Sequence, residues 1–256
     1  MVLVLDIENS TILLGAYNKE GLLFKSTLRA DLSKTADEYA VSFLSILTLY
    51  RHLSTEIEGC IICSVVPALL STVRQALAHL TCARIYVVGP GIKTGLNIKT
   101  DNPAQLGANL VCGAVAVLDK YAAPALLINL DTAVTIVALD ANKNLIGASI
   151  APGVLISLEA LIARTAQLPQ IGLETVPPTV LGTNTVSSMQ SGLVYGTSCM
   201  IDGMVDKFSA LLDTNPILVA TGDIAPFILP HCAHTIIEDA TLILDGLYLI
   251  YEKNIK

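Results

Sequence analysis

The chain has 256 residues, which at about 150 residues per domain is enough for one large domain or two small ones. Hydrophobic residues make up 53% of it and charged residues 14%, so the composition excludes a disordered chain and predicts a large buried core. Lys and Arg number 15 against 22 Asp and Glu, a net charge of −7. This acidic balance argues against nucleic acid or an anionic membrane surface as the main partner.

The apolar runs are all interrupted before the roughly 18 to 20 residues that a membrane span needs. The first ten residues, MVLVLDIENS, contain acidic Asp6 and lack a basic leader, so we expect a cytoplasmic protein with no membrane partner. Six cysteines lie mostly in apolar surroundings, and we expect them to be reduced.

Two short patterns have the spacing of redox or metal sites. Cys60 and Cys63 enclose two isoleucines, but the run is strand-like, so their side chains are expected on opposite faces and core packing is favoured. His231, Cys232 and His234 form a short cluster without a second ligand pair, which favours a surface loop.

The first half of the chain is predicted to form three antiparallel strands and then alternating helices and strands. A polar segment at 8–11 separates the first two strands, and Thr35 and Glu38 have the spacing of a capping box. The predicted strands are 2–6, 12–17, 22–27, 60–65 and 85–88, and the predicted helices are about 39–47 and 67–80.

The second half repeats this order. Strands are predicted at 125–129, 134–140, 145–150 and 217–220, and helices at about 154–167, 185–212 and 240–252. We therefore expect two similar domains, 1–116 and 117–256, with a ligand cleft between them.

Short motifs follow one another along both halves. They read DIENS at 6–10, TADEY at 35–39, SVVP at 64–67, GPGIKTGLN at 89–97 and DNP at 101–103. They continue with DTAVT at 131–135, IAPG at 150–153, GTNT at 182–185, ATG at 220–222 and LYLIYE at 247–252. Over almost the whole chain these motifs resemble the type III pantothenate kinases.

The resemblance implies an α/β fold of two ribonuclease H-like domains, as in the actin, Hsp70 and sugar-kinase superfamily, with mixed sheets flanked by helices. Both would be actin-like ATPase domains, and the second would carry a dimer interface. It also implies transfer of the γ-phosphoryl group of ATP to the hydroxyl of pantothenate, toward coenzyme A, with Mg²⁺ and a monovalent cation, K⁺ or NH₄⁺.

The resemblance also implies site residues. The nucleotide positions are Asp6, Glu8, Asn9, Ser10, Asp131, Thr132, Thr221, Gly222 and Asp223. The pantothenate positions are Thr100, Gly107, Ala108, Leu110 and Thr185, the last reaching across the dimer interface. Asn109 stands at the position of the family's proton-accepting Asp, Asp6 would also hold metal, and Asn129 stands at the monovalent-cation position.

On the nucleotide side the sequence departs from the family pattern at three glycines, which are replaced by Glu8, Asp131 and Asp223. Like charges at about 4 Å repel by ~4 kcal/mol at an effective dielectric near 20. The first two carboxylates are therefore expected to weaken triphosphate binding unless Mg²⁺ bridges them, and Asp223 is expected to obstruct adenosine sterically.

On the acceptor side the family's Asp and Arg are replaced by Asn109 and Leu110, and its tyrosine is replaced by Thr100. An amide has no useful basicity, and we expect nothing basic nearby to take over. Our main hypothesis is a catalytically degenerate kinase subunit that works with an intact paralogue as a heteromer. The alternatives are an active or weakly active homodimeric kinase and a protein that senses ligands or regulates without catalysis.

Overall fold

The computed structural model describes residues 1–173, 176–212 and 214–255. Their contacts divide the chain into two compact units, each with its own sheet. Unit 1 contains Met1–Leu96, Asp101–Asp119 and Thr241–Lys256, and unit 2 contains Asn97–Thr100 and Lys120–Ala240.

The sheet of unit 1 has the strand order β3-β2-β1-β4-β5. The first three strands pair antiparallel, and β4 and β5 add in parallel, as the sequence pattern predicts. The strands are β1 (Val2–Ile7), β2 (Thr11–Asn18), β3 (Gly21–Arg29), β4 (Gly59–Ser64) and β5 (Arg84–Val87).

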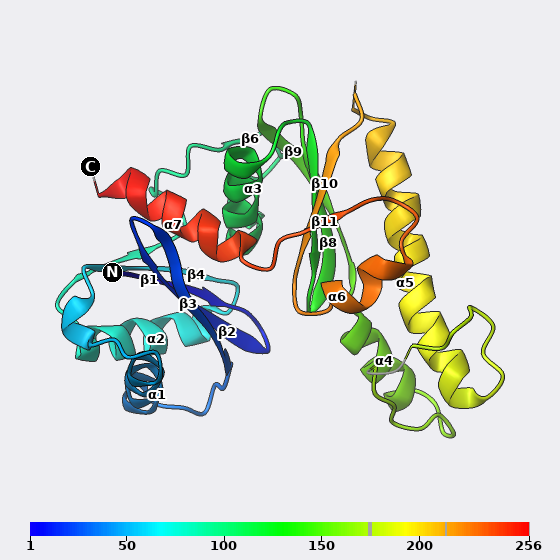
Figure 1. The fold of residues 1–256 in the computed structure, drawn as a ribbon, viewed down its shortest axis with the longest axis horizontal. Coiled ribbons are helices and arrows are strands. Elements are labelled where there is room, and N and C mark those ends of the chain that lie inside the picture. The colour runs from blue at the N-terminus through cyan, green and yellow to red at the C-terminus, as the bar shows by residue number, and fades with distance from the viewer. Residues whose placement is uncertain (174–175, 213, 256) are drawn as a thin grey trace. The chain divides into compact units, whose positions relative to one another are not determined.

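Helices cover both faces of this sheet (Figure 1). α1 (Ala36–Leu49) and α2 (Pro67–Leu80) pack on the face that carries Leu3 and Leu5 of β1. α7 (Leu242–Asn254) and α3 (Ala108–Lys120) pack on the other face, against Val2 and Val4. Because side chains alternate along a strand, Asp6 points to the same face as Val2 and Val4.

The two cysteines of β4 confirm the predicted alternation. Cys60 lies in the core beneath α1 and α2, and Cys63 lies in the core beneath α3 and α7. Both thiols are free, and burial raises the pKa of Cys60 to about 12. The spacing of this pair therefore reflects packing on two faces of one strand.

The sheet of unit 2 repeats the pattern, with the order β11-β10-β7-β8-β9-β6. Strands β7, β8 and β9 pair antiparallel, and β10 and β11 add in parallel. The strands are β6 (Asn97–Ile98), β7 (Ala125–Leu130), β8 (Ala133–Leu139), β9 (Asn144–Pro152), β10 (Ile217–Thr221) and β11 (Ile237–Glu238).

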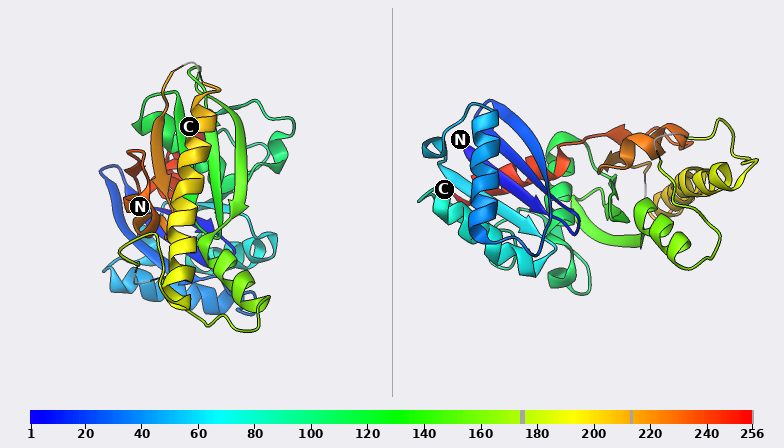
Figure 2. Two further views of the ribbon diagram at one scale, coloured as in Figure 1. Left: turned by 90° about the vertical axis from the view of Figure 1, so that its right-hand side faces the viewer. Right: turned by 90° about the horizontal axis from the view of Figure 1, so that it is seen from below.

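One face of this second sheet is covered by α4 (Val154–Ala163), α5 (Thr185–Ser209) and the short α6 (Ala225–Ile228). Figure 2 shows α5 running along the sheet. Both long helices end three or four residues before the predicted ends at 167 and 212. In the described part of the chain, no helix combines the length and the hydropathy of a membrane span.

Helix α7 belongs to unit 1 although it is the last helix of the chain, because it packs on β1, β2 and β4. The compact units are therefore discontinuous in sequence. The division into domains 1–116 and 117–256 describes the repeated sequence pattern, and it stays a prediction.

Candidate functional site

Two buried carboxylates lie at the end of strand β1: Asp6 within the strand and Glu8 just after it, 3% and 7% exposed. Asp6 accepts a hydrogen bond from the thiol of Cys63, its partner on β4, at 2.8 Å. Burial raises the pKa of Cys63, and a hydrogen bond with Cys112 and the charge of Asp6 raise it further. The thiol therefore stays protonated and remains a donor to Asp6.

Glu8 opens the turn between β1 and β2, where its backbone N–H donates to the carbonyl oxygen of Thr11 at 2.9 Å. Its Oε1 accepts a hydrogen bond from Nδ2 of Asn109 at 3.1 Å. Asn109 is 9% exposed, and its Oδ1 accepts from the backbone N–H of Leu110 at 2.9 Å. The expectation that no basic group lies near Asn109 is wrong, because the carboxylate of Glu8 touches it.

The other predicted site residues of unit 1 differ in solvent accessibility. Asn9 and Ser10 are exposed at the tip of the turn, while Gly107 and Ala108 are half-buried at the start of α3. Leu110 is 4% exposed and packs in the core. Its side chain offers neither charge nor accessible surface to a ligand.

Unit 2 places two predicted turns next to each other, at the carboxyl ends of parallel strands β7 and β10. Gly222 has a φ of +108°, and a Cβ at this position would lie 2.2 Å from the carbonyl oxygen of Leu130. In the neighbouring turn, Oδ1 of Asp131 accepts from the backbone N–H of Thr132 at 2.9 Å. Asp223 is exposed.

A row of buried polar side chains crosses the middle of this second sheet. Thr221 of β10 is in register with Asn129 of β7, which is in register with Thr135 of β8. All three are less than 8% exposed, and Oγ1 of Thr135 has no hydrogen-bond partner among the described residues. The same holds for the buried Oγ1 of Thr100, in the same unit.

The structure therefore brings predicted residues together within each unit. In unit 1 it joins Glu8 and Asn109 and pairs Asp6 with Cys63, and in unit 2 it joins the turns after β7 and β10. Sequence reasoning did not identify Cys63 and Thr135 as parts of these clusters. Their strand registers with Asp6 and Asn129 were the signal that could have found them.

Thr185 lies elsewhere in unit 2, exposed at the first turn of α5. It borders a cavity of about 440 Å³ between α4 and α5. The other lining residues are mainly apolar or small: Ser157, Leu161, Leu168, Ser188, Met189, Gly192 and Leu193.

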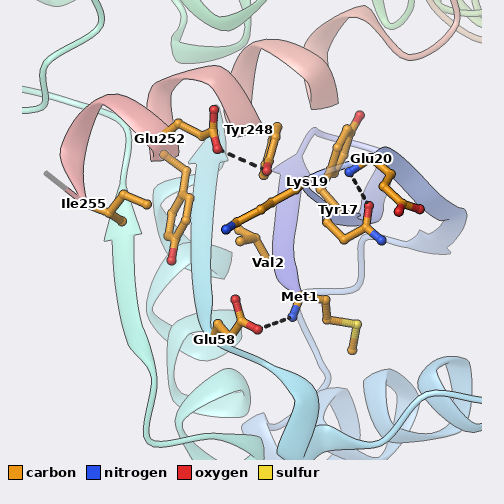
Figure 3. A pocket seen from close by; sticks show the side chains of 11 residues that line it. Met1, Val2, Tyr17, Lys19, Glu20, Glu58, Tyr248, Glu252 and Ile255 are labelled. Carbon is orange, nitrogen blue, oxygen red and sulfur yellow. Dashed lines mark hydrogen bonds and ion pairs between the residues drawn. The ribbon is translucent and has the colours of Figure 1, made fainter.

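Unit 1 has a cavity of about 350 Å³ between the β1–β2 hairpin and the end of α7 (Figure 3). None of the predicted site residues lines it. Two contacts within it are an ion pair of the terminal ammonium of Met1 with Glu58 at 3.3 Å and a hydrogen bond from the hydroxyl of Tyr248 to Glu252 at 3.2 Å. This arrangement is typical of a solvated polar surface.

Comparison with known proteins gives the family. The family model for type III pantothenate kinase matches residues 2–207. The chain belongs to the type III pantothenate kinase family. A type III pantothenate kinase of Halalkalibacterium halodurans is 39% identical over 255 residues, and one of Exiguobacterium sp. is 39% identical over 256. Both alignments cover 100% of this chain and of the relative.

Solved structures give the fold. A propionate kinase from Francisella tularensis superposes with a TM-score of 0.54 at 11% identity, covering 97% of each chain. The fold is that of the actin, Hsp70 and sugar-kinase superfamily, with mixed sheets flanked by helices. This confirms the fold that the sequence motifs imply.

Proposed function

We propose that this chain is a catalytically degenerate subunit in the ATP-dependent phosphorylation of pantothenate, toward coenzyme A. It would work with an intact paralogue as a heteromer. The observation that carries the proposal is Asn109, an amide at the position of the family's proton acceptor, with its Nδ2 bound to Glu8 and its Oδ1 bound to Leu110 N–H.

The acceptor side also lacks its anchor. An arginine at position 110 would bind the carboxylate of pantothenate through a charge-assisted pair, and the buried side chain of Leu110 cannot. Weak binding and a missing base act on different terms of the rate, since one raises KM and the other lowers kcat.

At the predicted nucleotide site, side chains differ from the family pattern while the backbone of one turn is kept. The buried carboxylate of Glu8 would repel a triphosphate by ~4 kcal/mol at a contact near 4 Å and an effective dielectric near 20. Gly153 is retained where a Cβ would lie 2.3 Å from the carbonyl oxygens of Asp131 and Thr132. The backbone of that turn is therefore kept, and the changes are concentrated on side chains.

The residues present fit a divalent cation better than a monovalent one. Buried carboxylate oxygen is a preferred ligand of Mg²⁺, so Asp6 would hold this ion, which would neutralise charge on the phosphates of ATP. At the monovalent-cation position, Asn129 and its register neighbours Thr135 and Thr221 supply neutral oxygens. K⁺ or NH₄⁺ would therefore bind more weakly than beside a carboxylate.

The exposed face of α5 has features that favour a partner-binding surface. Gly192, Gly196 and Cys199 are exposed at helical spacing, so another helix could approach closely. The apolar cavity beside Thr185 and the exposed side chains of Leu155 and Val186 lie on the same two helices. An intact partner would cover this surface and receive Thr185 at its pantothenate site.

The test compares the chain alone, an intact type III pantothenate kinase from the same genome alone, and the two co-expressed, by ATP-dependent phosphorylation of pantothenate. We expect turnover near background for the chain alone. In the mixture we expect Thr185→Ala in this chain to raise the partner's KM for pantothenate, while Ser188→Ala does not. Turnover by the chain alone comparable to that of the intact enzyme overturns the proposal.

A second candidate is a weakly active kinase, and the same contact favours it, because Glu8 keeps a carboxylate beside position 109. Phosphoryl transfer depends mostly on positioning and charge stabilisation, so a displaced base could suffice. This candidate predicts turnover by the chain alone that Glu8→Gln abolishes and the exposed control Glu20→Gln leaves unchanged.

A further inference from the structure

Glu8 and Asn109 lie 101 residues apart in sequence and meet in the interior of unit 1. Relative to the family pattern, position 8 has gained a carboxylate and position 109 has lost one. The two changes are therefore complementary in charge, and the structure shows that their side chains are in contact at 3.1 Å.

The orientation of the Asn109 amide is fixed by its second hydrogen bond. Its Oδ1 accepts from the backbone N–H of Leu110, so Nδ2 is the group that faces Glu8. An Asp at position 109 would place a carboxylate oxygen at the same place, about 3 Å from Oε1 of Glu8 and shielded from water. Two such carboxylates cannot both be ionised readily, so one would hold a proton and an Asp at 109 would not be free to act as a base beside Glu8.

The reverse change is also unfavourable by itself. Replacing Glu8 by Gly would leave the buried Nδ2 of Asn109 without this acceptor. It would also remove a negative charge close to the start of α3, where the N-terminus of a thirteen-residue helix favours anions. The turn backbone itself allows the change, because glycine can adopt any backbone conformation that Glu8 adopts.

We propose that Glu8 and Asn109 are a matched pair that holds one carboxylate on the turn after β1 instead of on α3, and that phosphoryl transfer by this chain's own site returns only when both residues are exchanged. This inference rests on the proposed function. Asn109 is a positioning residue that keeps the carboxylate of Glu8 in place.

The experiment is a double-mutant cycle in the full chain, with Glu8→Gly, Asn109→Asp and the combined variant. Each is assayed with pantothenate and Mg²⁺-ATP and unfolded in urea. We expect each single variant to unfold more readily than the wild-type chain and to turn over no faster. We expect the combined variant to turn over roughly 10 to 100 times faster, less than the 10² to 10⁴ that a base contributes, because Leu110 and Thr100 are unchanged.

Matched controls are Glu20→Gly and Asn142→Asp, which make the same exchanges at exposed turn positions and should show no coupling. Three results would overturn the inference. One is a gain in turnover for Asn109→Asp alone that equals the gain of the combined variant. The others are additive effects of the two changes on the free energy of unfolding, and a combined variant that turns over no faster than the wild-type chain. Fast turnover by the wild-type chain contradicts the proposed function instead, and the ratios among the four chains still test the pair.

Discussion

Two kinds of glycine position can be distinguished at the scale of single residues. Gly222 has a left-handed backbone, and both Gly222 and Gly153 have carbonyl oxygens within 2.3 Å of where a Cβ would be. Glu8, Asp131 and Asp223, which the sequence analysis expects at positions of family glycines, have no positive φ in the described chain. The fold therefore requires glycine at 153 and 222, whereas the backbone at 8, 131 and 223 accepts a side chain.

Gly222→Ala tests this distinction. The added methyl would meet Leu130 at 2.2 Å in a backbone conformation that alanine rarely adopts, so we expect a loss of about 2 to 4 kcal/mol in the free energy of unfolding. Gly203→Ala, an exposed site inside α5 with open space around it, is the control and should gain up to about 1 kcal/mol. Urea denaturation measures both, and equal effects would contradict the argument.

The contact between Glu8 and Asn109 shows what sequence reasoning at this scale could not supply. Each substitution is visible in the sequence, and each by itself indicates a damaged site. Their proximity depends on α3 packing against the face of β1 that carries Asp6, which is a tertiary contact. The sequence presents two separate substitutions, and the structure adds that the two side chains are in contact.

At the scale of elements, the start of α1 was predictable because its signal is local. The carboxylate of Glu38 accepts hydrogen bonds from the backbone N–H of Thr35 at 2.7 Å and from its hydroxyl at 2.9 Å. Glu38 N–H donates in return to Thr35 Oγ1, which completes the capping box. The bond from the Thr35 backbone, followed by the one from its side chain, lowers the pKa of Glu38.

This cap gives a pH-dependent prediction. A carboxyl whose pKa is lower in the folded chain adds stability above its unfolded pKa, about 4.3, and loses it as the pH falls through the folded pKa. Glu38→Gln should therefore lower the midpoint of thermal unfolding at pH 7 and have little effect near pH 3. The exposed Glu20→Gln is the control. A difference between wild type and Glu38→Gln that persists at pH 3 contradicts the charge-based account.

Helix α3, which is buried along most of its length, is not among the helices predicted from the sequence. Residues Asn109 to Val117 are all buried, so no polar face alternates with an apolar one. Its packing against α7 is close: a Cβ on Gly246 would lie 1.9 Å from the carbonyl oxygen of Cys112. Apolar runs buried on all sides give no directional signal, and their secondary structure is decided by tertiary contacts.

Gly246→Ala should disrupt the close packing of α7 against α3. The methyl would overlap the backbone of α3, so we expect destabilisation by about 1 to 3 kcal/mol or more, with Gly203→Ala again as the control. Because α3 also carries Asn109, the variant should weaken the Asn109–Glu8 contact as well. Hydrogen exchange of the α3 amides measures this, and unchanged protection would contradict the link between the two contacts.

At the scale of the whole molecule, one strand order occurs twice, and the repeated pattern of apolar segments made it predictable. The path of the last segment was not predictable in this way. Residues after 240 return to unit 1, where α7 fills the face of the sheet opposite α1 and α2. A sequence repeat identifies similar sheets, while the unit that receives a terminal helix depends on which core has an uncovered face.

The proposed assembly makes a prediction that cysteine labelling can test. Cys82 and Cys199 are exposed, in units 1 and 2 respectively, while Cys60, Cys63 and Cys112 are buried. If the face of α5 that carries Gly192, Gly196 and Cys199 binds an intact partner, a thiol reagent should modify Cys199 at least tenfold more slowly in the heteromer than in the chain alone. Cys82 should react at an unchanged rate and serves as the internal control, with Cys199→Ser to assign the signal. Equal protection of both thiols would indicate a general effect of crowding, and no protection of Cys199 in a heteromer would place the interface on another surface.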